Sequence, residues 1–344
     1  MNPDRLRRAP NIAIVGSSSP VGKELKDLIQ ETGLPVGNVK LLDTEEYAGL
    51  LQEFAGQIQI TQIISPSAFE NVDIAFFACS PSIMKAYAAS GSAFPDIAID
   101  LTQTGREGTI FLNGVSNLNL VKDAGYFINP HPAVIVLARL LASLHSNFGV
   151  ESSTVTILEP TSERGAGAIE ELQEQTVRLL NFQPVGSRVF KGQIAFNVLP
   201  ESESAAGTET LIRTQLAAIL GSAIPVPALI TLQVPVFHSE SFSIFVRFVK
   251  TPAVDELRHC LADTKGAMVV NDDPKDSPSP VSVVGSDKVH IGRIAMDPYE
   301  RSTCGFWVAA DNLRVAASNA LGIAESIMRT ANGGKVASSP EGRG

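Results

Sequence analysis

The sequence predicts an α/β protein with a doubly wound parallel sheet in its first domain and an α+β second domain whose sheet is mainly antiparallel. Up to about residue 147, continuous apolar runs alternate with helical patterns, which is typical of a parallel sheet covered on both faces. Beyond that point, β-rich runs follow one another with few helical patterns between them. At 344 residues the chain can form two cores, since one core rarely grows beyond roughly 250 to 300 residues. The first domain is therefore expected to be of the Rossmann type.

The first domain begins with a strand, a tight turn and an amphipathic helix. The β-rich run at residues 11–16, NIAIVG, ends in a glycine and serine turn. The segment at residues 20–33 then places apolar residues at helical spacing, and its final glycine suits the end of a helix. Further elements are expected as strands at residues 39–43, 73–80, 96–101 and 125–129, with helices at 81–90 and 133–144.

The second domain is expected to consist mainly of strands. Its β-rich runs lie at residues 153–158, 228–249, 288–297 and 305–311, with an exposed loop at 271–280 and a last helix at 313–330. We assign the domains to residues 1–130 with 313–336 and to 131–312, and we expect a disordered tail at 337–344.

Composition argues against several classes of partner. The net charge is −9 and the 27 lysines and arginines are scattered, so we expect no nucleic-acid partner. The longest apolar runs fall short of the roughly 18 residues that span a bilayer, and no apolar signal segment precedes the first strand. We therefore expect a cytoplasmic protein with no membrane partner.

The cysteines do not predict a disulfide framework or a metal site. Cys79, Cys260 and Cys304 are widely spaced and include no CxxC pair. We interpret each one as a small buried residue.

A dinucleotide site is predicted at the turn GSSSPVG between the first strand and helix. Gly16 and Gly22 flank the turn, and Ser19 stands where a glycine-rich fingerprint has its middle glycine. Backbone N–H groups and the helix start would face a phosphate there, and serine hydroxyls also donate to phosphate. The alternative is a purely structural turn. The candidate cofactor residues are Gly16, Ser18, Ser19, Pro20, Val21 and Gly22.

The end of the second predicted strand bears on the choice of cofactor. Asp43 lies about 20 residues past the turn, where a carboxylate would accept hydrogen bonds from both ribose hydroxyls of NAD. Glu46 adds a negative charge that would repel a 2′-phosphate. The residues thus favour NAD over NADP, unless DTEE is simply a solvated acidic turn.

Several motifs give the chain a resemblance to the aspartate-semialdehyde dehydrogenase family from about Asn11 to Arg329. GSSSPVG is similar to the family's G-A-T-G-A-V-G, and LPVGNVKLL resembles the segment that follows it. The C-terminal FWVAADNLRVAASNALGIAE is similar to the family's W-V-V-S-D-N-L-R-K-G-A-A. The remaining matches are IAFNVLP, VPVF and GRIAMD.

The resemblance implies an enzyme of amino-acid biosynthesis. Such enzymes reduce aspartyl phosphate to aspartate semialdehyde with NADPH through a cysteine thioester, as homo-oligomers built on the substrate domain. It therefore implies a small-molecule substrate, a homodimer through the second domain, and cofactor contacts from Ser80 and Asn312.

The nucleophile position of the family departs from its pattern. The family's N-P-N-C-[ST] corresponds to residues 129–133, NPHPA, which places Pro132 at the cysteine. A thiolate at a helix start is stabilised by backbone dipoles, whereas proline offers no nucleophile and lacks the N–H that could stabilise an oxyanion. Pro132 nevertheless suits the first position of a helix.

Residues around the family's substrate depart as well. The family's T-Y-Q-A-V-S-G-A-G corresponds to residues 157–165, ILEPTSERG, so that Glu159 replaces the substrate-binding glutamine and Ser162 lies in the same stretch. A carboxylate there would repel an anionic substrate. The arginine of V-R-V-P-V becomes Gln233, and the histidine of G-H-S-E corresponds to His238 only if about two residues are deleted before it.

Two further positions concern phosphate. The family's R-S pair for the 2′-phosphate falls on Glu46 and Tyr47. Arg106 aligns with the family's phosphate-binding arginine, and its alternative is a surface arginine in a polar loop.

Three interpretations follow from these departures. In the first, the chain keeps the fold and the dinucleotide pocket but has lost thioester chemistry, and acts by binding a ligand or partner. In the second, it is an oxidoreductase in which His131 or His238 moves the proton, because histidine titrates near neutral pH; alternatively, His131 caps a helix and His238 sits at a strand end. In the third, another thiol supplies residual family activity, although neither Cys79 nor Cys304 begins a helix.

Overall fold

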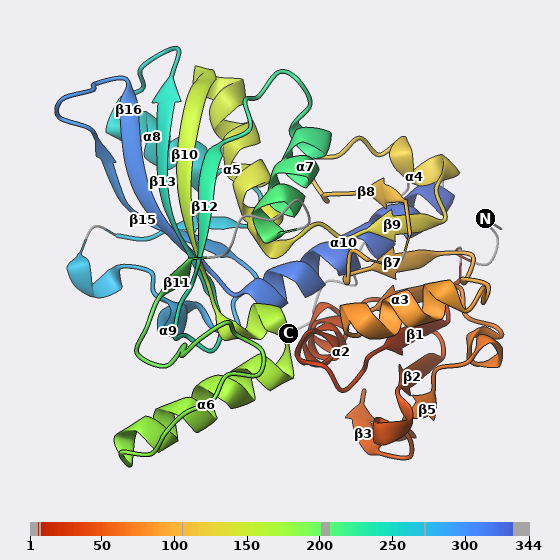
Figure 1. Cartoon of the computed structure of the whole chain (residues 1–344). Coiled ribbons are helices and arrows are strands. Elements are labelled where there is room, and N and C mark those ends of the chain that lie inside the picture. Colours follow the sequence, from red (N-terminus) through yellow and green to blue (C-terminus); the bar gives the residue numbers. More distant parts are fainter. Residues whose placement is uncertain (1–5, 7, 105, 201–206, 272, 333–344) are drawn as a thin grey trace, which may run out of the picture. The chain divides into compact units, whose positions relative to one another are not determined.

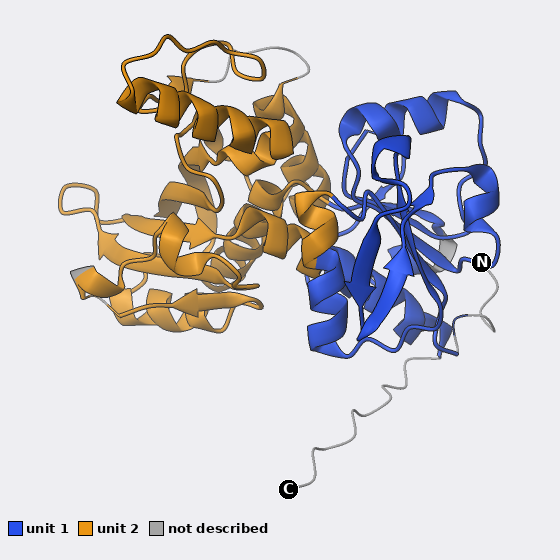
Figure 2. Ribbon diagram, turned by 90° about the horizontal axis from the view of Figure 1, so that it is seen from below, with its two compact units in different colours: residues 1–18, 25–129, 319–344 blue, residues 19–24, 130–318 orange. Residues whose placement is uncertain are grey.

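The computed structural model describes residues 6, 8–104, 106–200, 207–271 and 273–332 (Figure 1). The chain divides into two compact units, one formed by residues 1–18, 25–129 and 319–344 and the other by 19–24 and 130–318 (Figure 2). We call them unit 1 and unit 2. The tail predicted at 337–344 lies outside the described residues.

Unit 1 contains the predicted parallel sheet. Its seven strands follow the order β5-β2-β1-β6-β7-β9-β8, and every neighbouring pair is parallel. The buried β1 strand reads IAIV without alternation, as expected for a strand covered on both faces. The strands are β1 (Ile12–Val15), β2 (Val39–Asp43), β5 (Gln62–Ile63), β6 (Ile74–Phe77), β7 (Ala98–Asp100), β8 (Thr109–Ile110) and β9 (Tyr126–Ile128).

The remaining elements of unit 1 surround this sheet. A hairpin of β3 (Leu51–Phe54) and β4 (Gln57–Ile60), which the sequence did not predict, follows β2. The helices are α2 (Pro20–Thr32), α3 (Pro81–Ala89), α4 (Leu120–Asp123) and α10 (Asn312–Ala331), with 3-10 turns η1 (Glu45–Tyr47) and η2 (Pro66–Phe69). Both α2 and α10 begin in unit 2 and continue into unit 1.

Unit 2 is built on a second seven-stranded sheet with the order β11-β12-β10-β13-β16-β15-β14. The β10–β12 and β14–β15 pairs are parallel, whereas the other pairs are antiparallel, so the sheet is mixed but mainly antiparallel. The strands are β10 (Val150–Glu159), β11 (Leu199–Pro200), β12 (Ala228–Gln233), β13 (Glu240–Phe248), β14 (Ala267–Val269), β15 (Val289–Met296) and β16 (Thr303–Ala310).

The expectation of few helices in unit 2 was wrong. The helices are α5 (Pro132–Phe148), α6 (Ala166–Leu180), α7 (Thr208–Leu220), α8 (Val254–Ala262) and α9 (Pro280–Val283), with 3-10 turns η3 (Thr161–Arg164) and η4 (Pro274–Asp276). The sequence of α6 does not show a continuous apolar face at helical spacing, because its buried face includes the polar residues Glu171 and Gln175. Glu171 accepts the backbone N–H groups of Arg188 and Val189, which satisfies its buried carboxylate.

Candidate functional site

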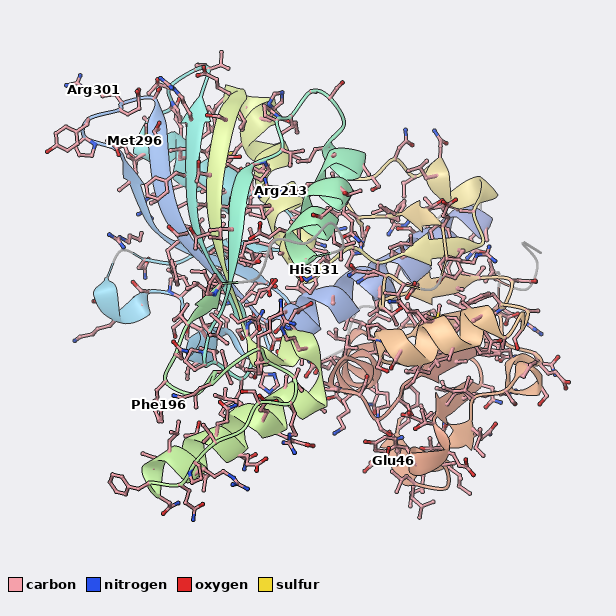
Figure 3. The ribbon with its side chains drawn as sticks, viewed as in Figure 1. Glu46, His131, Phe196, Arg213, Met296 and Arg301 are labelled. Carbon is pink, nitrogen blue, oxygen red and sulfur yellow. The ribbon has the colours of Figure 1, made fainter. Side chains whose placement is uncertain are left out.

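His131 lies at the start of α5, immediately before Pro132 (Figure 3). Its Nδ1 accepts the N–H of Ala133 at 3.2 Å, and its own backbone N–H donates to Gln215 Oε1 at 2.8 Å. Pro132 takes the first helical position, where a missing N–H leaves no intrahelical bond unmade. This is the geometry of the capping alternative, and it fixes the imidazole in a site where only 5% of the residue is exposed.

The other edge of the imidazole meets a carboxylate that the sequence did not single out. Nε2 lies 3.0 Å from Oε1 of Glu163, which belongs to η3. Oε2 of Glu163 accepts a hydrogen bond from Asn312 Nδ2 at 2.9 Å. The only sequence signal for this pair was the presence of a second acid within ILEPTSERG.

Electrostatics favour a charged imidazole. Burial opposes the charge, but Glu163, with Glu240 and Glu159, raises the pKa of His131 to about 9. Burial likewise opposes ionisation of Glu163, and the imidazole overcomes it, lowering the pKa of that carboxyl. Protonating Nδ1 would break the bond from Ala133, but that single neutral bond is weaker than the charge-assisted pair with Glu163.

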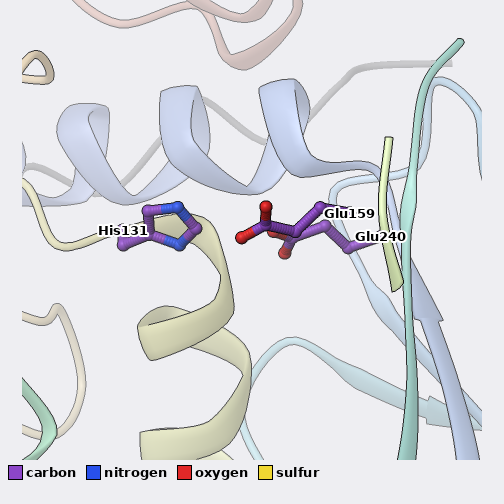
Figure 4. Close-up of side chains that lie close together, drawn as sticks. All are labelled: His131, Glu159 and Glu240. Atoms are coloured by element: carbon purple, nitrogen blue, oxygen red, sulfur yellow. The ribbon is translucent and has the colours of Figure 1, made fainter. Parts of the chain in front are cut away.

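Two further acidic residues lie in this part of unit 2. Glu159 ends β10 directly opposite Gln233 at the end of β12, and the Gln233 amide donates to its carboxylate. Glu240 begins β13 with no exposed surface, and its two carboxyl oxygens have no hydrogen-bond partner among the described residues. Burial, followed by the charge of Glu163, raises the pKa of Glu240 well above its usual value. Figure 4 shows both carboxyl groups directed toward His131.

Asn312 ties the elements of this site together. Its Oδ1 accepts the hydroxyl of Ser162 at 3.2 Å and the backbone N–H of Ser239 at 3.1 Å, while its amide nitrogen donates to Glu163. Asn312 is 1% exposed and Ser162 is 4% exposed. The structure thus brings together Asn312, expected at the cofactor, with Ser162, expected at the substrate, inside unit 2.

The glycine and serine turn requires glycine at its first position. Gly16 has a φ of 81°, and a Cβ there would lie 2.5 Å from the Cα of Cys79. The Ser18 N–H donates to Asp43 Oδ2 at 2.9 Å, and the amide of Gln52 on β3 donates to the hydroxyls of Ser17 and Ser18. These contacts all lie within unit 1.

The second half of the turn starts α2. Ser19 Oγ accepts the N–H of Gly22 at 3.0 Å, as an N-cap serine does. Pro20 and Val21 are the first two residues of α2. These residues belong to unit 2.

Unit 1 contains a cavity of about 370 Å³ at the end of β2. Asp43, Ile64, Ser65 and Tyr87 are among its lining residues. Asp43 also accepts the Thr44 N–H at 2.9 Å, so that two backbone N–H groups of the described residues bond to a carboxylate with about four acceptor positions. The cavity can therefore take a ligand that offers hydroxyl groups to Asp43.

Three other predicted residues lie on the surface of unit 1. Glu46 is exposed on η1 (Figure 3), and Ser80 precedes α3, with its hydroxyl 2.9 Å from that of Ser82. The guanidinium of Arg106 lies 4.8 Å from the ring centre of Tyr126, although its side chain is largely exposed. Arg106 belongs to unit 1, whereas the other predicted substrate residues, Glu159 and Ser162, belong to unit 2.

His238, the second candidate base, lies in the loop before β13. It is half-buried, and its Nδ1 has no hydrogen-bond partner among the described residues. The adjacent Phe237 carbonyl accepts the Ser162 N–H at 3.0 Å, so the loop is held against η3.

The thiols of the chain are poor nucleophiles. All three cysteines are free and buried. Burial raises the pKa of Cys79 to about 12 and that of Cys304 to about 11, and it also raises the pKa of Cys260. A reactive cysteine needs a lowered pKa, so these environments suit small core residues.

Comparison with known proteins finds two family models that cover most of the chain. Residues 11–122 match the model described as semialdehyde dehydrogenase, NAD binding domain, and residues 141–315 match semialdehyde dehydrogenase, dimerisation domain. Within the described residues, no helix has the length and apolar character needed to cross a membrane.

Individual relatives match along almost their whole length. The aspartate-semialdehyde dehydrogenase of Rickettsia bellii is 27% identical over 93% of this chain and 98% of its own length. A USG-1 protein homolog of Pseudomonas aeruginosa is 28% identical over 93% of this chain and 98% of its own. The crystal structure of aspartate semialdehyde dehydrogenase II complexed with ASA from Vibrio cholerae superposes with a TM-score of 0.83 at 26% identity, covering 94% of this chain and 99% of that one.

Proposed function

Because the chain belongs to the semialdehyde dehydrogenase family, we propose that it is a homodimeric member that binds a dinucleotide and a small molecule but does not perform the family's thioester reaction. The observation that carries this proposal is the structure at the start of α5. Pro132 occupies the helical position to which the family's nucleophile motif aligns, and it has no group that can attack a carbonyl.

The environments of the cysteines do not support a thioester reaction at another position of the chain. An attacking thiolate is stabilised at a helix start or beside cationic groups, whereas the Cys79 thiol is buried with Asp100 and Asp43 as its charged neighbours. Cys304 lies within β16 and is fully buried. Residual family activity through another cysteine therefore has little support.

The charges near His131 also disfavour the family substrate. Where the motifs align the family's glutamine and arginine, this chain has Glu159 and Gln233, which bond to each other. Glu159, Glu163 and Glu240 thus make the site rich in carboxyl groups, and Gln233 stands where the family's arginine would have supplied a positive charge. An aspartyl phosphate would bring two kinds of anionic group into a buried acidic site, at a large electrostatic cost.

Two acidic residues at or near the cavity of unit 1 support NAD rather than NADP as the cofactor. Asp43 lines the cavity of unit 1 and can accept ribose hydroxyls, and Glu46 lies three residues further along the chain. A 2′-phosphate near these two acids would be repelled. Titration calorimetry should detect NAD and NADH binding, weakened by Asp43→Asn, whereas tighter binding of NADPH than of NADH would overturn the choice of cofactor.

The proposal as a whole is tested by turnover. Purified protein is incubated with aspartate semialdehyde, phosphate and either NAD or NADP. The rate at which reduced cofactor forms should be no higher than the rate without protein. Sedimentation or light scattering should give the mass of two chains. Turnover at an ordinary enzymatic rate, about 1 s⁻¹ or faster, would refute the loss of the reaction.

A second function is favoured by the His131–Glu163 pair. With its pKa raised to about 9, the imidazole carries a proton at neutral pH and would be the group that supplies a proton to a carbonyl oxygen, while bound NADH would supply the hydride. Such a reaction needs no thiol. A panel of small aldehydes and ketones with NADH tests it: turnover that is lost in His131→Gln would support it, and no turnover with any of them would remove it.

A further inference from the structure

We propose that His131, Glu159 and Glu240 form a buried site for a divalent transition-metal ion of the zinc class. One ligand atom from each residue lies within 4.8 Å of the other two, and all three residues are buried. The ligands come from the start of α5, the end of β10 and the start of β13. Their separation along the chain explains why no sequence motif predicted a metal site.

Glu240 provides an observation that is independent of this clustering. It has no exposed surface, both of its carboxyl oxygens lack a hydrogen-bond partner among the described residues, and Figure 4 shows it directed at His131. A buried carboxyl without a partner loses the hydrogen bonds that water gave it, so such groups normally have a partner in the folded protein. A cation held between Glu240, Glu159 and His131 supplies that partner.

The surrounding contacts resemble the support that metal ligands usually have. Ligating histidines commonly donate their second ring N–H to a carboxylate. Here Nε2 of His131 faces Glu163 at 3.0 Å, and Asn312 holds Glu163 in place. This arrangement makes Nδ1 the ligand atom. An incoming ion would displace the proton that the nearby carboxyls favour on the imidazole at neutral pH, and it would take the place of the hydrogen bond from the Ala133 N–H at 3.2 Å.

The donor set selects the class of ion. One imidazole nitrogen and two carboxylates suit zinc and its neighbours, whereas magnesium and calcium prefer oxygen ligands alone. Zinc bonds to nitrogen and oxygen are about 2.0 to 2.2 Å long, so two ligands of a tetrahedral ion are about 3.4 Å apart. The three ligand atoms, which now lie within 4.8 Å of one another, would have to close by up to about 1.4 Å, a shift that rotation of the two glutamate side chains can supply.

Three protein ligands would leave one tetrahedral position open. Zinc with three protein ligands typically binds water or a small molecule at its fourth position. The ion would thus be held by three buried side chains of unit 2, with one coordination position left for water or a small ligand. The metal inference rests on the geometry of unit 2 and does not depend on dinucleotide binding or on the loss of turnover.

Zinc binding to the full chain is the direct test. Protein stripped with a chelator is titrated with zinc chloride in a competing chelator buffer, and one ion per chain should bind. Glu240→Gln should weaken zinc at least tenfold, since it replaces an anionic ligand by a neutral amide. Glu151→Gln, an exposed acid on the same strand as Glu159, is the matched control and should bind zinc as the unaltered protein does.

The glutamine introduced by Glu240→Gln keeps the shape of the protonated glutamate, so this variant should fold. Its melting temperature without metal should be no lower than that of the unaltered protein, and the same zinc concentration should raise the melting temperature of the unaltered protein more than that of Glu240→Gln. Cobalt(II), bound in place of zinc, should show the visible absorption of a tetrahedral site with nitrogen and oxygen ligands. Absence of stoichiometric zinc binding, or equal zinc affinity in Glu240→Gln, would overturn the proposal. Neither result would bear on turnover, so the two proposals fail separately.

Discussion

Replacing Glu240 by glutamine should stabilise the metal-free protein, and the gain should grow with pH. Burial and the nearby Glu163 raise the pKa of Glu240 well above its usual value. A carboxyl whose pKa is higher in the folded state binds more protons when folded, so its favourable contribution is complete below the unfolded pKa of about 4.3. That contribution is lost as pH rises through the folded pKa. Glutamine resembles the protonated form and does not titrate.

The pH dependence of this stabilisation comes from the one extra proton that Glu240 binds in the folded state. Between the unfolded and folded pKa values of Glu240, the difference in unfolding free energy between variant and unaltered protein should grow by about 1.4 kcal/mol for each pH unit. Above the folded pKa the difference becomes constant. Groups that do not interact with Glu240 titrate alike in both proteins, so their contributions cancel in the difference.

Urea denaturation at a series of pH values from 5 to 8, with chelator present, measures this difference. The midpoint and slope at each pH give the unfolding free energy of Glu240→Gln and of the unaltered protein. Glu151→Gln, whose acid is exposed, should give a difference that stays nearly constant with pH. Parallel curves for Glu240→Gln, or a variant that becomes relatively less stable as pH rises, would show that the pKa of Glu240 is not raised in the folded protein.

Three further predictions concern other parts of the chain. Gly16→Ala should lower the unfolding free energy by about 2 kcal/mol or more, because the φ of Gly16 is 81° and a Cβ there would lie 2.5 Å from backbone atoms. Gly33→Ala is the control, since Gly33 also has a positive φ but open space around it, and it should lower the unfolding free energy by less in the same thermal melt. Equal losses in the two variants would show that the clash at Gly16 is not the cause. Glu163→Gln should bring the pKa of His131 down from about 9 in an NMR titration of the ring, and an unchanged value would show that Glu163 is not its main partner. Glu46→Arg should tighten NADP a few-fold in calorimetry and leave NAD unchanged, while no gain would place the 2′-phosphate elsewhere.

The parallel sheet of unit 1 could be predicted because its strands are buried on both faces. Runs such as IAIV and IAFF are continuous and alternate with helical patterns, so local sequence carries the fold. The β3–β4 hairpin was missed because exposed Leu51, Ile58 and Ile60 do not follow the pattern of a buried strand. The α6 helix was missed because its buried face includes polar side chains.

The candidate site was only partly predictable for a different reason. Pro132, His131 and Glu159 lie in segments that resemble family motifs, so their positions could be compared with known roles. Glu163 and Glu240 lie near His131 only because the tertiary structure places η3 and the start of β13 beside the start of α5. Pairing across the sheet also determines which residues bond, as with Glu159 and its neighbour on β12, and no local pattern contains that register.

The loss of thioester chemistry is tested most directly by mass spectrometry of the protein after incubation with aspartate semialdehyde and NAD or NADP, without phosphate. Under these conditions a family enzyme would retain the acyl group on its nucleophile. We predict an unchanged mass for the unaltered chain, because Pro132 has no nucleophilic group and all three thiols are buried. An acyl adduct on a cysteine, discharged when phosphate is added, would contradict the account.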